Sequence, residues 1–195
     1  MMNRVYEEIK EKLMKFKDLG YEEREGCLLI GKPSYLPKFA WLVRIMAPLT
    51  KEDFSFMEEK YSIKVPSVYK DFLLSFSNGL SLFSGTFALE GYRKHYKRDE
   101  SALLQPFALD ISNVFERPKN AKATYFFMGS YDWDGSELYI DTETNHVHFC
   151  KRDDATSLYE WNSFEEMLSS EIDRLLKLFT DDGRPIDENQ STLPC

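Results

Sequence analysis

The sequence contains few of the residues on which disulfide frameworks and metal sites depend. Only three cysteines (Cys27, Cys150 and Cys195) and three histidines occur among its 195 residues. The cysteines are widely spaced and odd in number, so they predict neither a disulfide framework nor a zinc ligand set. We therefore expect a protein of a reducing, cytoplasmic compartment that uses no metal or other cofactor.

Long hydrophobic runs are also missing. Stretches such as Phe39–Val43 are far shorter than the roughly 20 apolar residues that a membrane-spanning helix needs. Residues 1–17 mix glutamate and lysine every few positions and contain no apolar segment of the kind found in secretory signals. These absences predict a chain that neither binds a membrane nor carries a secretory signal.

Local catalytic and metal-binding motifs are absent as well. The sequence has no glycine-rich phosphate loop, no Gly-x-Ser-x-Gly elbow and no His-Glu-x-x-His helix. His146 and His148 alternate on one expected strand, but two imidazoles without a third ligand do not make a zinc site. Asp132–Gly135 is similar to the start of a calcium loop, yet its glycine falls in the wrong register. We expect a turn before a strand there, and no enzymatic activity.

Positive charge is in deficit. Acidic residues outnumber lysine and arginine by 33 to 25, which gives a net charge of −8. The imbalance is concentrated, because residues 1–127 carry 20 basic and 17 acidic residues whereas residues 128–195 carry 5 and 16. Nucleic-acid binding requires clustered lysine and arginine, so no nucleic-acid partner is expected. A negative field instead favours encounter with a basic protein.

Apolar and aromatic residues are abundant, at 43% and 15%, and are sufficient for a folded core. Apolar spacing predicts helices over 3–18, between Thr50 and Tyr61, from Pro66 to a stop at Asn78–Gly79, and over 164–179. Thr50 and Ser163 are expected to cap two of these helices, since each has an acidic residue three positions later.

Apolar alternation predicts strands at 26–31, 86–89, 125–128, 136–141 and 146–150, of which the last two form a hairpin. Residues 92–122 show no clean period and are expected to be a long loop with short elements. Helices at the start, a central and mostly antiparallel sheet, and a closing C-terminal helix together predict an α+β fold.

The helical pattern changes near Ala47, which suggests three regions. Residues 1–47 are expected to be an N-terminal helix and strand extension. Residues 48–180 would form the α+β domain. Residues 181–195 are polar, contain several acidic side chains and are expected to be a mobile acidic tail.

Several short motifs occur together in the second region. Pro66-x-x-Tyr-x-x-Phe-Leu is followed by Asn78-Gly79 and then by Leu89-Glu90-Gly91-Tyr92, with Asp134-Gly135 and Ser163-Phe164 further on. In this combination, over roughly residues 48–180, the chain resembles the SUKH superfamily, which includes fungal cell-wall regulators of the Smi and Knr type. The resemblance implies an α+β fold and a binding role. Many bacterial members look like immunity proteins that neutralise a polymorphic toxin, often a nuclease, by binding it directly.

The leading hypothesis is therefore a cytoplasmic immunity protein for a basic cognate toxin domain. A regulatory or scaffold module of the cell-wall-regulator type is the alternative, and an enzyme that uses the acidic sheet with a metal is the third. The sequence leaves the oligomeric state open. In the leading hypothesis, carboxylates steer and pair with basic groups while a tryptophan provides a buried anchor. The candidate contact residues are Asp132, Trp133, Asp134, Glu137, Asp141 and Glu143.

Overall fold

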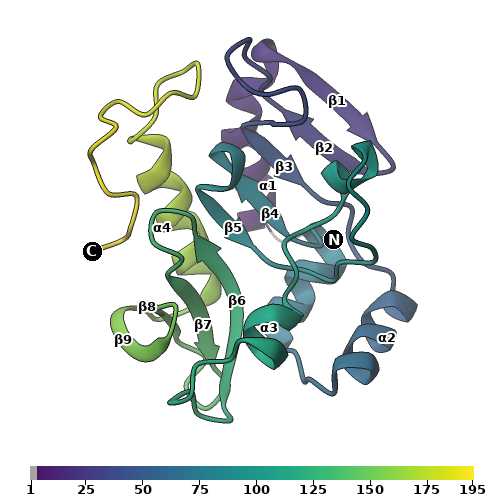
Figure 1. Cartoon of the computed structure of the whole chain (residues 1–195), viewed down its shortest axis with the longest axis vertical. Coiled ribbons are helices and arrows are strands. Elements are labelled where there is room, and N and C mark those ends of the chain that lie inside the picture. The colour runs from purple at the N-terminus through teal and green to yellow at the C-terminus, as the bar shows by residue number, and fades with distance from the viewer. Residues whose placement is uncertain (1–3) are drawn as a thin grey trace.

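The computed structural model describes residues 4–195. Nine antiparallel strands form one sheet in which every strand pairs with its neighbours in sequence (Figure 1). These strands are β1 (Tyr21–Arg24), β2 (Cys27–Ile30), β3 (Val43–Ile45), β4 (Leu80–Leu82), β5 (Phe87–Leu89), β6 (Tyr125–Tyr131), β7 (Glu137–Asp141), β8 (Val147–Lys151) and β9 (Asp154–Trp161).

The α-helices are α1 (Arg4–Leu13), α2 (Lys51–Tyr61), α3 (Ser67–Asp71) and α4 (Phe164–Leu176). Short 3₁₀ segments are η1 (Met14–Leu19), η3 (Phe83–Gly85) and η4 (Glu100–Leu104), and π-helical turns are η2 (Phe72–Phe76) and η5 (Ile111–Phe115). The α+β class predicted from the sequence is confirmed.

The predicted helix starts follow from side-chain caps. The Thr50 hydroxyl accepts a hydrogen bond from the Asp53 backbone N–H at 3.1 Å, and Ser163 accepts one from Glu166 at 3.1 Å. Such bonds satisfy backbone donors that have no partner inside the helix. The last helix ends at Leu176 rather than at Phe179, because residues 177–178 form a turn and Phe179 makes an isolated β-bridge with Pro185.

Four strands were not predicted. β3 and β4 have three residues each, which is too short for a visible period, and β1 reads Tyr-Glu-Glu-Arg, with no apolar alternation. β9 buries only Ala155 and Trp161 among its eight residues, so its sequence resembles a solvated segment. All four owe their strand conformation to backbone pairing with neighbours rather than to their own apolar pattern.

Residues 4–47 share the sheet and the core with the rest of the chain. β3 pairs with β4 across the expected boundary, as Arg44 with Ser81. Tyr6 of α1 stacks on Phe76 with ring centroids 5.0 Å apart. The C-terminal segment also contacts the body, where the Arg174 guanidinium donates to the Thr192 carbonyl at 2.6 Å.

The two faces of the sheet are covered differently. One face carries the main hydrophobic core, against which α1 and α4 pack on the same side (Figure 1). Paired residues on an antiparallel sheet point to the same side. The register therefore defines one row across the opposite face, called here the second face: Leu29, Arg44, Ser81, Ala88, Ser130, Glu137 and Cys150.

The second face is covered by the loop that joins β5 to β6. The Asn113 side chain in η5 accepts from the Phe127 N–H at 3.0 Å and donates to the Phe127 carbonyl at 2.7 Å, as a neighbouring strand would. The Arg44 side chain donates to the Leu103 carbonyl at 3.4 Å. Hydrogen bonds at η4 and at η5 therefore hold this loop against the sheet. Its polar residues contact polar residues of the row on the second face.

Candidate partner-binding site

The β6–β7 turn presents three of the predicted contact residues. Asp132, Trp133 and Asp134 are all exposed, and Trp133 has 47% of its surface accessible. The Asp134 carboxylate accepts from the Ser136 N–H at 2.9 Å, and Gly135 adopts a left-handed φ of 74°. Gly135 is suited to this conformation because L side chains rarely adopt it. The turn thus holds its own shape and leaves Asp132 and Trp133 free to meet a partner.

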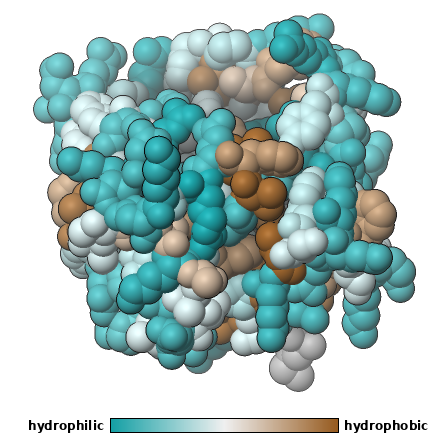
Figure 2. Space-filling view, turned by 60° about the horizontal axis from the view of Figure 1, so that its bottom comes forward, coloured by the Kyte–Doolittle hydropathy of each residue, from teal (hydrophilic) through white to brown (hydrophobic). Residues whose placement is uncertain are grey.

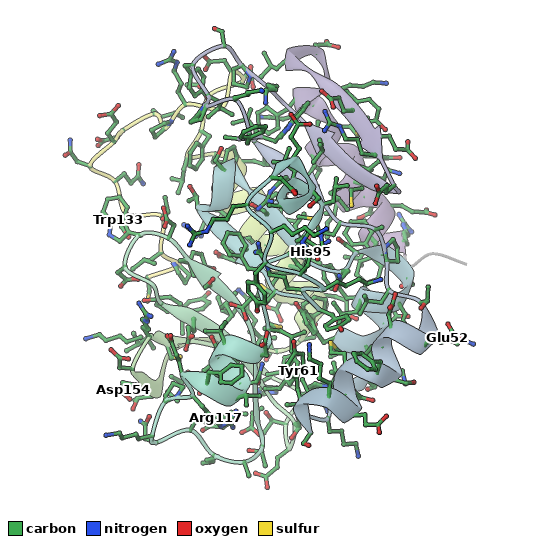
Figure 3. All side chains as sticks on the ribbon, turned by 45° about the vertical axis from the view of Figure 1, so that its right-hand side comes forward. Glu52, Tyr61, His95, Arg117, Trp133 and Asp154 are labelled. Atoms are coloured by element: carbon green, nitrogen blue, oxygen red, sulfur yellow. The ribbon has the colours of Figure 1, made fainter. Side chains whose placement is uncertain are left out.

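A shallow apolar cleft lies on one side of this turn. It has a volume of about 350 Å³, and its lining includes Leu42, Phe83, Trp133 and Phe179. Phe83 and Phe179 stack with centroids 3.7 Å apart. Figure 3 shows Trp133 at the outer edge of the molecule beside the C-terminal segment, which supplies Asp187 and Glu188 to the rim of the same cleft.

An acidic cleft of about 470 Å³ lies on the other side of the turn. It shares Ser84 and Asp132 with the apolar cleft, so the two are continuous around the turn. Its charged lining residues are Glu90, Glu116, Asp132, Asp134, Glu137 and Arg152. The Arg152 guanidinium is bonded to Glu116 at 2.8 Å.

Glu137 forms the inner wall of the acidic cleft. It begins β7, opposite Ser130 of β6, and is only 6% exposed. The Ser112 hydroxyl donates to its Oε1 at 2.5 Å, whereas its Oε2 has no partner. Burial raises the pKa of Glu137 to about 7, although the Ser112 bond and the Arg152 charge act in the opposite direction.

Glu90 forms the other inner wall and was not among the predicted contact residues. It directly follows β5, is 6% exposed, and has an unpartnered Oε2. Burial raises the pKa of Glu90 to about 8, and repulsion from Glu137 and Asp110 adds to this effect. The sequence carried no local signal for this burial, because the alternation of β5 places Phe87 and Leu89 on the core face and Glu90 on the opposite face with Ala88.

Residues of the sequence motifs that begin at Pro66, Asn78 and Leu89 hold the backbone at Glu90 in place. The Tyr69 hydroxyl donates to the Glu90 carbonyl and lies 3.0 Å from the Met128 carbonyl. The Asn78 side chain pairs with the Tyr92 backbone, accepting at 2.7 Å and donating at 2.9 Å. A Cβ on Gly91 would approach Asn78 to 2.4 Å, so only glycine fits between them.

The structure separates the last two predicted residues from the first four. Asp141 ends β7, about 13 Å of strand away from Glu137 at the usual rise per residue. Asp141 is 7% exposed and accepts from the Glu143 N–H at 3.1 Å, which shapes the β7–β8 turn. Glu143 is exposed in this turn. The six residues therefore form two groups, at opposite ends of β7.

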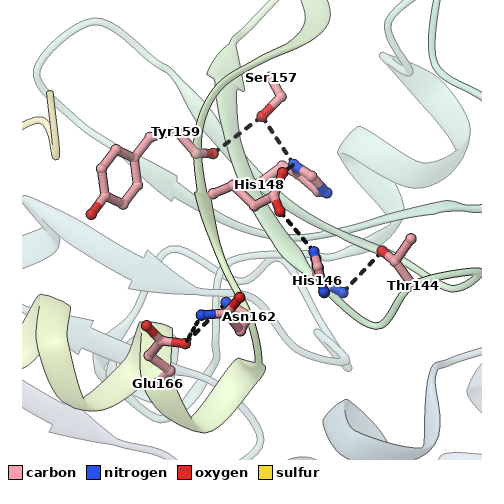
Figure 4. Close-up of polar contacts among 8 residues, drawn as sticks. Thr144, His146, His148, Ser157, Tyr159, Asn162 and Glu166 are labelled. Atoms are coloured by element: carbon pink, nitrogen blue, oxygen red, sulfur yellow. Dashed lines mark hydrogen bonds and ion pairs between the residues drawn. The ribbon is translucent and has the colours of Figure 1, made fainter.

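His148 lies in β8 and His146 directly precedes this strand, and both are near Asp141 and contact β9 (Figure 4). His146 Nδ1 is 2.7 Å from the Glu160 carboxylate, and His148 Nδ1 is 2.9 Å from the Ser157 hydroxyl. Burial lowers the pKa of His148. Within residues 4–195, no group of three or more histidine, cysteine, aspartate or glutamate side chains is arranged to hold a metal ion.

The arrangement presents an exposed aromatic side chain and several carboxylates on one part of the surface. An exposed tryptophan stands between carboxylates, with an apolar cleft on one side and buried acids on the other. Figure 2 shows one face of the molecule on which hydrophilic residues predominate and hydrophobic ones reach the surface only in small areas. No helix among the described residues is long and apolar enough to cross a membrane.

Comparison with known proteins supports the resemblance seen in the motifs. Residues 48–170 match the family model described as the SMI1 / KNR4 family (SUKH-1). The match spans α2 to β9 and the first half of α4, and so includes the acidic cleft and the β6–β7 turn, whereas most residues that line the apolar cleft lie outside it. A search of curated proteins gives no significant match to the chain.

Proposed function

Because the chain belongs to the SMI1/KNR4 family (SUKH-1), we propose that it is an immunity protein that binds a cognate toxin domain and blocks it. Domains of this family commonly act in this way and are generally non-catalytic. The proposed interface is centred on the β6–β7 turn. The cell interior, where a toxin would act, is the proposed place of action.

The observation that carries this proposal is the exposure of Trp133 between Asp132 and Asp134. Tryptophan is the residue most often found as an energetic anchor of protein interfaces, and such anchors lie within a polar rim. The turn fixes the position of Trp133 before binding, so little conformational entropy is lost on association.

The charge of this part of the chain favours a basic partner. Residues 128–195 carry 16 acidic and 5 basic side chains, and the turn lies within this part of the chain. An acidic face accelerates encounter with a basic one and discourages acidic competitors. A nuclease domain fits this requirement, because an active face that binds a polyanion is itself basic.

The test is rescue of growth from a candidate toxin domain, chosen among the products of the genes that neighbour this one. Co-expression of the wild-type chain is expected to restore growth, and the purified pair is expected to form a stable complex. The variant Asp132→Lys with Trp133→Ala should lose both properties. Glu59→Lys on α2 is the matched control, since Figure 3 places Glu52 of the same helix at the opposite edge from Trp133. Failure of the wild-type chain to bind or rescue would overturn the proposal.

A further inference from the structure

Three carboxylates buried on the second face each have one oxygen without a hydrogen-bond partner. These atoms are Oε2 of Glu90, Oε2 of Glu137 and Oδ1 of Asp110, in residues that are 6%, 6% and 4% exposed. A buried acceptor without a donor is unfavourable, because it has lost its hydrogen bonds to water and gained none from the protein. Glu90 and Glu137 both line the acidic cleft, so these buried carboxylates border the space that a donor from outside would enter.

The charges around the cleft favour a cation. Five of its lining residues carry carboxylates and one, Arg152, carries a guanidinium. Arg152 is already bonded to Glu116 at 2.8 Å, on the side of the cleft away from β5. Glu90 and Glu137 have no cationic partner among the salt bridges of residues 4–195.

We propose that the acidic cleft receives one arginine side chain of the protein partner, whose guanidinium pairs with Glu90 and Glu137. The inference rests on the proposed function and deepens it, because it names the chemical group that the interface recognises. The arginine would enter beside Asp132, where the cleft opens next to the exposed turn.

The residues that line the cleft favour a guanidinium over an ammonium. A guanidinium presents five donors in a planar fork, which can satisfy two carboxylates at once, whereas an ammonium is a compact and strongly hydrated charge. The outer walls are partly apolar, with Phe107 40% exposed and Ile111 37% exposed. A flat, weakly hydrated group packs against such walls at a lower desolvation cost.

Binding at buried acids has a pH signature that binding at exposed acids lacks. The charged neighbours of the pair are Asp110, Glu116, Arg152 and Asp153. A cation favours the ionised carboxylates, so its entry displaces protons that Glu90 and Glu137 hold near neutral pH. Affinity should then rise with pH, by at most about tenfold per unit for each proton released.

The experiment is an NMR titration of the full-length protein with N-acetyl-arginine amide at about pH 6 and about pH 8. N-acetyl-citrulline amide is the uncharged control of the same shape, and N-acetyl-lysine amide is the second cation. We expect the arginine probe alone to shift the amide resonances of Gly85, Ser130 and Gly135, and the shifts to saturate with a millimolar dissociation constant. Binding should be at least about fivefold tighter at the higher pH.

Variants locate the effect. Glu90→Gln combined with Glu137→Gln should weaken arginine binding by at least about tenfold and remove its pH dependence, whereas Glu59→Gln on the exposed face of α2 should leave both unchanged. If the double variant folds poorly, the comparison of arginine with citrulline on the wild-type protein still tests the inference.

Several results would overturn the inference. The inference is wrong if the arginine probe causes no saturable shift. Toxin rescue would still test the immunity role independently. Equal binding of the lysine probe would remove the guanidinium preference. Displacement of the arginine probe by millimolar Ca²⁺ in the same cleft would make the site one for metal ions.

Discussion

Glu137 and Asp141 lie four residues apart on β7, point to the same face of the sheet, and are almost equally buried, at 6% and 7%. Their surroundings differ. Asp141 accepts from the backbone N–H of Glu143, as the first residue of a tight turn. Glu137 has one hydroxyl donor, from Ser112, and one oxygen with none.

This difference separates a structural acid from one that is available to a ligand. Backbone donors that belong to the same turn form with the turn itself, so Asp141 needs nothing from outside. Glu137 depends on a loop 25 residues away in sequence and still lacks a donor. Glu137, whose carboxylate lacks a hydrogen-bond donor, lies at the same end of β7 as the exposed Trp133.

The largest expected effect is on partner binding at the two ends of the strand. Asp132→Lys with Trp133→Ala should weaken toxin binding by at least about 100-fold, because the anchor is lost and the steering charge is reversed. Glu143→Lys, at the other end, should change the affinity by only about twofold to threefold. Titration calorimetry or surface binding kinetics would measure both. Equal losses at the two ends would show that the interface spans the whole strand.

The next effect is on stability against pH. Burial raises the pKa of Glu90 from 4.5 to about 8, so the folded protein keeps a proton that the unfolded chain releases. The free energy of unfolding therefore falls as pH rises from about 4.5 to about 8. Glu90→Gln removes this penalty, and should stabilise the protein by about 1–3 kcal/mol at pH near 8.5 while changing little at pH near 5.

Urea unfolding at both pH values tests this expectation. Glu143→Gln is the matched control, since the residue is exposed and its replacement should shift neither curve. Parallel stability curves for Glu90→Gln and wild type would show that Glu90 is ionised at the same pH in the folded and unfolded states.

A smaller effect is expected from loss of the structural acid. Asp141→Ala removes the acceptor that shapes the β7–β8 turn and should destabilise the fold by about 1–2 kcal/mol. Glu137→Gln keeps the Ser112 contact and removes a buried charge, so it should be neutral or mildly stabilising above pH 7. Chemical denaturation of the two variants gives the comparison directly. A larger cost for Glu137→Gln than for Asp141→Ala would reverse our assignment of the two acids.

The sequence predicted the elements that carry their own signals. Thr50 and Ser163 cap their helices as expected, and the hairpin of β7 and β8 follows from its apolar alternation and its turn residues. These features depend on interactions between residues that are close in sequence, which a local pattern can report.

The sequence did not reveal which acids are buried. Exposed Asp132 and buried Glu137 look alike in a list of charges, and only the docking of η5 on the second face distinguishes them. Glu90 was overlooked because its burial depends on Tyr69, Asn78 and the β5–β6 loop, which lie far from it along the chain. Contacts of this kind come from the tertiary fold and leave no local pattern.

The smallest expected effect is on stability, from loss of the Glu160 carboxylate near the β7–β8 turn. Glu160 contacts His146 at 2.7 Å, but the two side chains are 50% and 35% exposed, so water screens the pair. Glu160→Gln should therefore cost no more than about 0.5 kcal/mol at pH 7, and should leave arginine binding at the acidic cleft unchanged. Unfolding in urea with and without added salt measures the first quantity, and the probe titration measures the second. A change in arginine affinity would mean that the two ends of β7 are electrostatically coupled across the buried cluster that includes Phe127, Tyr139 and Cys150.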